Sequence, residues 1–183
     1  RLLAHAPQGV APGQPLLLGL QIAHQPKWHT YWKNAGDSGL PTDLQWTLPH
    51  GLDVGEIAWP LPQKIPVGTR ANYGYEGTLL LPVPVTVGNN FKPGLLSNTL
   101  DVKLSAAWLV CKEVCIPEEG EFSLQVPIKG STAANGAAFE AALAAQPKAL
   151  QGGAHSVAPV AAGKGHNIDV KVGNLPAAWR GQT

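Results

Sequence analysis

The sequence predicts an all-β domain, built as an antiparallel β-sandwich and followed by a short helix and the opening of a second β-domain. Its 183 residues include 21 glycines and 17 prolines, which disfavour long helices and favour many turns. Strand-like runs separated by clusters of turn residues recur about every ten residues, as in immunoglobulin-like sandwiches. A small barrel is the alternative architecture with the same pattern.

The expected strands are short, and turn residues stand between them. In chain order they are Pro15–Ala23, Trp28–Lys33, Asp43–Leu48, Glu56–Trp59, Thr78–Val87, Thr99–Val110 and Glu121–Ile128. Turn clusters lie at Asn34–Gly39, Pro49–Gly51 and Gly88–Asn90. The longest strongly apolar stretch, Leu16–Leu20, is far shorter than the ~20 residues that cross a bilayer.

Two of these strands predict their own pairing. From Leu100 to Ala106, and again from Glu121 to Val126, the even-numbered residues are mainly apolar and most odd-numbered residues are polar. We expect a hairpin in which Cys111 lies opposite Cys115. Three apolar pairs then share one face: Leu104 with Phe122, Val102 with Leu124, and Leu100 with Val126.

The character of the sequence changes after Ile128. We expect the sandwich to cover residues 1–129, a linker with a short helix to cover 130–150, and a flexible segment with the truncated start of a second β-domain to cover 151–183. The helix is predicted within Ala133–Gln146, which is rich in alanine and precedes Pro147. Residues 150–165 are rich in Gly, Ala and Pro, whereas Ile168–Val172 alternates like a strand.

Composition excludes some classes of partner. The formal net charge is +1 and charged residues make up 14% of the chain, with no basic stripe, so we expect no nucleic-acid partner. The chain starts at Arg1 and contains no methionine, which indicates a processed or excised piece of a longer protein, with a signal peptide removed.

Cys111 and Cys115 are the two cysteines of the chain. Opposed positions of a hairpin lie about 4.5–5.5 Å apart, within reach of a disulfide. Since Val110 continues the apolar face, we expect Cys111 on the opposite, more exposed face. Two cysteines at this spacing indicate a disulfide outside the cytoplasm, or a reduced pair that binds metal or carries out redox chemistry inside it.

Redox exchange is the reading we favour for this pair. A structural staple is the first alternative, but closing so small a loop stabilises a fold by only about 2 kcal/mol, against about 4–5 kcal/mol for a loop near 100 residues. A Cu(I) or Zn site is the second alternative, although no histidine lies near the cysteines in sequence, and we expect no metal. Lys112 would favour a thiolate and Glu113 would oppose it. With one pair and no cofactor implied, the domain would relay two electrons between other proteins.

A second segment bears on access to the cysteines. Asn72, Tyr73, Gly74 and Tyr75 lie between glycines, a composition that predicts a flexible loop with aromatic caps. Packing on a sheet edge is the alternative for these tyrosines. The aromatic run Trp28–Trp32 allows the same two readings, and we expect its tryptophans in the core.

Four segments together resemble a known family. They are Trp28–Asn34, Gly36–Gly39, Asn72–Gly77 and Trp108–Gly120. In this order they are similar to the N-terminal periplasmic domain of DsbD-type thiol:disulfide interchange proteins and of the related ScsB proteins. The resemblance covers residues 1–129. The best-studied members have five residues between their cysteines and a phenylalanine with acidic residues in the cap. The three-residue spacing here is closer to the ScsB-like branch.

The resemblance implies a protein-disulfide reductase domain, exposed to the periplasm as part of an inner-membrane protein. It would take electrons from a thioredoxin-like domain of the same or a partner reductase. It would pass them to periplasmic thioredoxin-fold proteins such as disulfide isomerases and cytochrome c maturation thioredoxins. By the same resemblance, Cys115 forms the mixed disulfides, Cys111 resolves them, and Asn72–Tyr75 is the cap loop. The alternatives are an immunoglobulin-like binding module with a structural disulfide and a copper-binding domain linked to copper tolerance.

Overall fold

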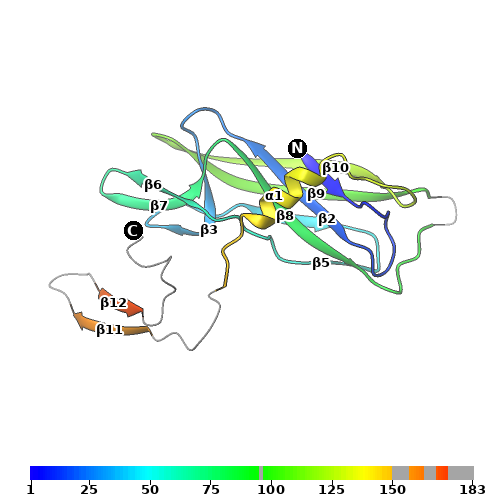
Figure 1. Cartoon of the computed structure of the whole chain (residues 1–183). Helices are drawn as coiled ribbons and strands as arrows, with labels where there is room; N and C mark the ends of the chain where they lie inside the picture. Colours follow the sequence, from blue (N-terminus) through cyan, green and yellow to red (C-terminus); the bar gives the residue numbers. More distant parts are fainter. Residues whose placement is uncertain (95–96, 150–156, 163–167, 173–183) are drawn as a thin grey trace. The chain divides into compact units, whose positions relative to one another are not determined.

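The structure is a computed structural model that describes residues 1–94, 97–149, 157–162 and 168–172. It divides the chain into two compact units, Arg1–Pro147 and Lys148–Thr183. Figure 1 shows the first unit as layered antiparallel strands with one short helix beside them.

Three antiparallel sheets make up the first unit. The first has the order β1 (Leu2–His5), β2 (Leu16–Ala23), β8 (Thr78–Val87), β5 (Leu52–Val54). The second has the order β10 (Cys115–Pro127), β9 (Thr99–Cys111), β4 (Asp43–Thr47). The third has the order β3 (Thr30–Gly36), β7 (Arg70–Tyr75), β6 (Gln63–Val67).

The first two sheets pack face to face over an apolar core. Leu18 and Val85 of the first sheet cluster with Leu100, Val102 and Val126 of the second, and each is at most 5% exposed. Apolar side chains that alternate along facing strands form such a core because successive residues point to opposite sides of a strand. The predicted all-β, immunoglobulin-like sandwich is therefore confirmed.

The hairpin of β9 and β10 has the predicted register. Leu104 pairs with Phe122, Val102 with Leu124 and Leu100 with Val126, and the ladder continues without a shift to Cys111 and Cys115. Figure 1 shows these two long strands side by side. Because the ladder is unbroken over 13 residues on each strand, the two cysteines are held at its end by the same register that buries the apolar pairs.

Helix α1 (Gly136–Ala144) lies within the predicted segment and packs on the first sheet. Phe139 is fully buried against Leu3 and Leu80, and the backbone carbonyl of Ala145 accepts a hydrogen bond of 2.7 Å from the backbone amide of Leu61. The first unit consequently extends to Pro147, so the helix that we expected in a linker belongs to the body of this unit.

One predicted strand does not form. Residues 56–59 are irregular, and the strand in this region is β5, which pairs with β8 up to Val85. The next residues of β8 along this antiparallel ladder, toward its N-terminal end, include Pro84 and Pro82, which have no amide hydrogen. Their carbonyls still accept hydrogen bonds of 2.8 Å from the amides of Gly55 and Ala58, but a regular ladder cannot continue past them.

The second unit contains an antiparallel hairpin of β11 (Val157–Ala162) and β12 (Ile168–Val172). The strand predicted at residues 168–172 is confirmed, whereas β11 falls in the stretch that we expected to be flexible. The remainder of the predicted flexible segment and of the second β-domain, residues 150–156, 163–167 and 173–183, lies outside the described residues. Within the described part of the chain, no helix is long and apolar enough to cross a membrane.

Candidate active site

The two cysteines form a disulfide at the tip of the β9–β10 hairpin. Cys111 and Cys115 are directly paired in the ladder, with their Cα atoms 4.1 Å apart. The amide of Lys112 donates a hydrogen bond of 3.0 Å to the carbonyl of Val114, which closes the turn between them. The opposed positions predicted for the pair are therefore confirmed.

Cys111 is buried, contrary to the expectation that it lies on the more exposed face. It is 2% exposed because a further backbone segment pairs with the end of β9. The amide of His29 donates to the carbonyl of Cys111 and the amide of Cys111 donates to the carbonyl of His29, both over 2.9 Å. The chain entering β3 thus extends the sheet beside Cys111, and the side chains of His29 and Tyr31 lie on the same face as that of Cys111.

Cys115 lies on the outer strand of the hairpin and is exposed. Its neighbours Val114 and Ile116 are 63% and 42% exposed, high values for apolar side chains. The disulfide therefore joins one buried residue to one exposed residue. An incoming thiolate can reach only an accessible sulfur, so this asymmetry favours attack at Cys115.

Two side chains of the segment entering β3 lie on the disulfide's side of the sheet. His29 is directly opposite Cys111, so their side chains share one face, and Tyr31 follows two residues later on that face. The hydroxyl oxygen of Tyr31 is 3.9 Å from Sγ of Cys115, within hydrogen-bond distance for sulfur. The same hydroxyl is 3.3 Å from Nε2 of His29, and the two rings meet edge to face.

Tyr31 is held firmly in this position. It is 2% exposed and forms a parallel bridge with Pro41, and Gly39 approaches its ring so closely that a side chain there would overlap the ring. Gly39 also has a φ of 101°, which glycine tolerates best. Burial raises the pKa of the Tyr31 hydroxyl, so it keeps its proton at neutral pH.

His29 is an electrically neutral partner for this hydroxyl at neutral pH. It is 3% exposed, and burial lowers the pKa of its imidazole below the usual 6.5. The negative charge of Glu76 opposes that shift and the proximity of His24 adds to it. His24 in turn is hydrogen bonded to the hydroxyl of Thr30 over 3.0 Å.

The predicted cap segment is a strand and not a flexible loop. Asn72, Tyr73, Gly74 and Tyr75 belong to β7, which pairs with β3 on one side and β6 on the other. Gly74 lies directly opposite Tyr31, and a side chain at Gly74 would overlap the backbone of β3. The aromatic residue beside the sulfur thus comes from β3.

The side chains of β7 occupy different surroundings. Asn72 is 1% exposed, and its Oδ1 accepts hydrogen bonds of 3.1 Å from the amide and the hydroxyl of Ser38. Tyr75 is buried beside Leu79, and its hydroxyl donates to the carbonyl of Pro60 over 2.8 Å. Tyr73 is 38% exposed. Of these residues, Tyr75 is clearly a core residue, and any capping role of the segment stays a prediction.

Lys112 and Glu113 lie exposed at the hairpin tip beside the sulfurs, where the sequence placed them. Their opposing influence on the cysteines stays a prediction. Among the described residues, no cluster of three or more His, Cys, Asp or Glu side chains is arranged to hold a metal ion.

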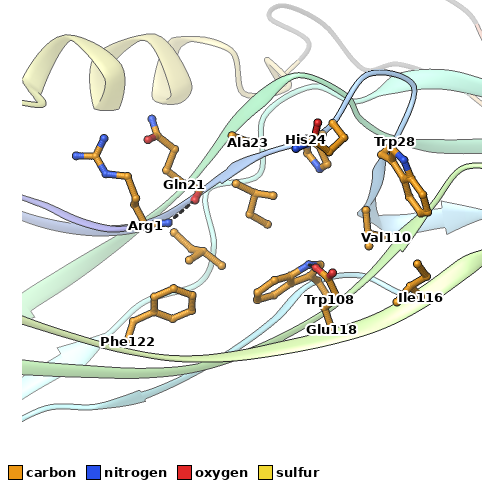
Figure 2. A pocket seen from close by; sticks show the side chains of 13 residues that line it. Arg1, Gln21, Ala23, His24, Trp28, Trp108, Val110, Ile116, Glu118 and Phe122 are labelled. Carbon is orange, nitrogen blue, oxygen red and sulfur yellow. Dashed lines mark hydrogen bonds between the residues drawn. The ribbon is translucent and has the colours of Figure 1, made fainter.

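A groove lies along the β9–β10 hairpin, on the face of the ladder opposite to that of the cysteine side chains. It has a volume of about 530 Å³, and its lining includes Trp28, Trp108, Val110 and Ile116. Val110 and Ile116 are the pair next to the cysteines in the ladder. Figure 2 shows Trp28, Val110 and Ile116 gathered at one end of the groove, with Trp108 farther along it. The volume falls within the range of sites that receive ligands or side chains.

The positions of His29 and Tyr31 at the site were not expected from the sequence. Both lie in the aromatic run Trp28–Trp32 and both are buried, whereas its two tryptophans, which we expected in the core, are half-buried. Their spacing of two residues was the available signal, because it places them on one face of a strand. Which strand this face meets is decided only by the long-range pairing of His29 with Cys111.

Comparison with known proteins identifies a family and a similar fold. The family model described as "Thiol:disulfide interchange protein DsbD, N-terminal" matches residues 2–127. The fold is similar to the crystal structure of the N-terminal periplasmic domain of ScsB from Proteus mirabilis, with a TM-score of 0.56 and 21% sequence identity. That match covers 84% of this chain and 56% of the solved chain. No curated protein sequence matches significantly.

Proposed function

The chain belongs to the family of N-terminal domains of the thiol:disulfide interchange protein DsbD, and on this premise we propose that it relays electrons between thioredoxin-like proteins through Cys111 and Cys115. At the coarse level it is a thiol–disulfide exchange domain whose cysteines form one disulfide. The observation that supports the finer proposal is the asymmetry of the bond, with Cys111 buried and Cys115 exposed.

On the basis of this asymmetry we propose a role for each cysteine. A donor thiolate attacks Sγ of Cys115, a new sulfur–sulfur bond forms to the donor, and Cys111 leaves as a thiolate with the electron pair. The second thiol of the donor then attacks the donor sulfur that is bonded to Cys115. The donor becomes a disulfide, and Cys115 is released in its reduced form. In the second half of the cycle the reduced domain passes its electrons on. Cys115 attacks the disulfide of the acceptor, and Cys111 then resolves the mixed disulfide. Lys112 favours and Glu113 opposes the thiolate form.

The surface around Cys115 is suited to a protein partner. Val114 and Ile116 flank it with exposed apolar surface, and Ile116 also lines the groove that contains Trp28 and Trp108. Exposed apolar side chains that gather around a reactive group are typical of interaction sites. We propose that a thioredoxin-like domain of the same or a partner reductase docks here as donor, and that thioredoxin-fold proteins dock here as acceptors.

Access to the sulfur is proposed to be limited by Tyr31. Its buried ring and hydroxyl stand beside Cys115, whereas Tyr75 packs in the core. We therefore assign the shield to β3, and to β7 the task of supporting it through Gly74, opposite Tyr31, and through the Asn72–Ser38 hydrogen bonds.

We also propose that this chemistry takes place in the periplasm, on a protein anchored in the inner membrane. Disulfides persist in oxidising compartments and are rare in the cytosol. The similar domain of ScsB is periplasmic.

The test is a thiol-trapping assay on the folded domain. Oxidised domain is mixed with a reduced thioredoxin-like protein, quenched with acid, and labelled with a maleimide that adds mass to each free thiol. We expect two labels per chain when the domain is reduced while folded and the labelling follows in denaturant after the acid quench. A sample reduced in denaturant defines complete labelling. If the folded domain takes up no label and the denatured domain takes up two, the disulfide is a structural staple and the proposal fails.

A further inference from the structure

Exchange through Cys115 requires its thiolate. A thiolate at a protein surface is stabilised by nearby cations or by hydrogen-bond donors. Among the described residues, the side-chain hydroxyl of Tyr31 is within hydrogen-bond distance of Sγ of Cys115, at 3.9 Å. Tyr31 is thus placed to act on the sulfur through its hydroxyl, a group that shielding alone does not need.

We propose that Tyr31 is a catalytic residue that donates its hydroxyl hydrogen to the Cys115 thiolate, and that His29 is the positioning residue that directs this hydrogen toward the sulfur. The inference rests on the proposed function, because the thiolate is useful only if Cys115 attacks a partner disulfide.

The hydroxyl has one hydrogen and two neighbours, Sγ of Cys115 at 3.9 Å and Nε2 of His29 at 3.3 Å. If Nε2 carries a hydrogen, His29 donates to the tyrosine oxygen, and the hydroxyl hydrogen is free to point at the sulfur. If Nε2 is bare, the hydroxyl donates to His29 instead and the thiolate loses its donor. The tautomer of His29 therefore decides whether Tyr31 stabilises the thiolate.

The backbone fixes His29 for this task. Its two 2.9 Å hydrogen bonds to Cys111 tie it to the strand that ends in the disulfide. Its ring also contacts the Tyr31 ring edge to face, with centroids 5.2 Å apart. These contacts fix the orientation of the His29 and Tyr31 side chains relative to the hairpin tip in the oxidised domain.

With Tyr31 as hydrogen-bond donor to Cys115, every bond, proton and electron pair of the exchange is accounted for. The Cys115 thiol loses its proton to solvent, and the thiolate accepts the Tyr31 hydrogen bond without taking that hydrogen. Sγ then attacks the partner disulfide, a bond forms between the two sulfurs, and the second partner sulfur leaves as a thiolate. Cys111 attacks Sγ of Cys115, and the first partner sulfur leaves with the second electron pair. The domain is oxidised by two electrons and the partner is reduced by two.

The test measures the pKa of the Cys115 thiol directly, without any partner. A Cys111→Ala background leaves one thiol and adds no hydroxyl that might compete for it. The rate of alkylation by iodoacetamide is followed from pH 5 to pH 10. We expect Tyr31→Phe to raise the pKa of Cys115 by about one unit, which is a roughly tenfold slower alkylation near neutral pH.

Controls separate the hydroxyl from its surroundings. Tyr75→Phe removes another buried hydroxyl, which bonds to Pro60 and not to sulfur, and is expected to leave the thiol pKa unchanged. Lys112 and Glu113 flank the cysteines in every variant, and Glu76 and His24 continue to act on position 29, so their charges cancel in the comparison. Far-UV circular dichroism confirms that each variant is folded.

His29 is tested by two replacements. His29→Gln supplies an amide that can donate to the tyrosine oxygen, and we expect a thiol pKa close to that of the parent. His29→Leu cannot donate, and we expect a pKa shifted toward that of Tyr31→Phe. Equal values for Gln and Leu would overturn the positioning role.

The pKa measurement on Cys115 and the thiol-trapping assay test separate claims. An unchanged Cys115 pKa in Tyr31→Phe would overturn the catalytic role of Tyr31, even if thiol trapping with a thioredoxin-like protein succeeds. Failure of that trapping, with the pKa shift present, would refute the relay and leave the Tyr31 hydrogen bond intact.

Discussion

The backbones of His29 and Cys111 exchange two hydrogen bonds, each 2.9 Å long, at the end of β9. These bonds join residues 82 positions apart in the chain. They place the chain that leads into β3 beside buried Cys111, and they bring the Tyr31 hydroxyl next to Sγ of Cys115. One cysteine becomes inaccessible and the other acquires a hydroxyl neighbour through the same contact.

Mixed-disulfide trapping should differ sharply between the two cysteines. Cys111→Ser leaves exposed Cys115 without its resolving partner, so we expect a stable mixed disulfide with a thioredoxin-like protein on non-reducing gels. Cys115→Ser leaves a thiol that is buried at position 111 and should give several-fold less complex, because attack needs access. Equal amounts of complex from the two variants would contradict the assignment of roles.

Removal of the Tyr31 ring should open the disulfide to small reductants. We expect Tyr31→Ala to increase the rate of reduction by dithiothreitol several-fold, and Tyr31→Phe, which keeps the ring, to stay near the parent rate. The measurement is the amount of free thiol, detected by labelling, as a function of time. It is made well below the unfolding temperature of each variant. Tyr73→Ala is the control, since Tyr73 is exposed on β7. If only Tyr73→Ala accelerates reduction, the cap belongs to β7 as the sequence suggested.

The helix should be an integral part of the first unit. Phe139 is fully buried against Leu3 and Leu80, so Phe139→Ala is expected to lower the free energy of unfolding by about 3–5 kcal/mol. The exposed Glu140 on the same helix provides the control, with a change within about 0.5 kcal/mol for Glu140→Ala. Urea unfolding measures both. A small effect of Phe139→Ala would show that the helix does not stabilise the sandwich.

Stability should fall on acidification below the usual histidine range. Burial is the main cause that lowers the pKa of His24 and of His29 from 6.5, so the folded protein binds fewer protons at these residues than the unfolded chain. Their contribution is fully present above pH 6.5 and is lost as the pH falls through the lowered values. We expect a smaller free energy of unfolding at pH 5 than at pH 7.5, and a shallower loss in His29→Gln. An equal loss in His29→Gln would exclude His29 as a source.

The pattern of apolar residues in the sequence was sufficient to predict the central strands of the sandwich and the pairing of β9 with β10. The strand at Thr78–Val87 and the pairing of Leu104 with Phe122 followed from local period and from the position of the two cysteines. These features depend on residues close in sequence, and a shift of one residue would have exposed every apolar pair. The strands β6 and β7 escaped prediction because Pro66 and Gly74 disfavour strands locally, and their pairing with β3 overrides that preference.

The sequence by itself determined that the chain is an antiparallel sandwich and that Cys111 and Cys115 lie opposite each other at a hairpin tip. Only the tertiary structure decided which sulfur is accessible and which side chain stands beside it. Alternation along β9 assigns Cys111 to solvent, and the contact with His29 reverses that assignment. Such a contact joins distant segments, and no local pattern encodes it, because burial of a strand face depends on what the rest of the chain places over it.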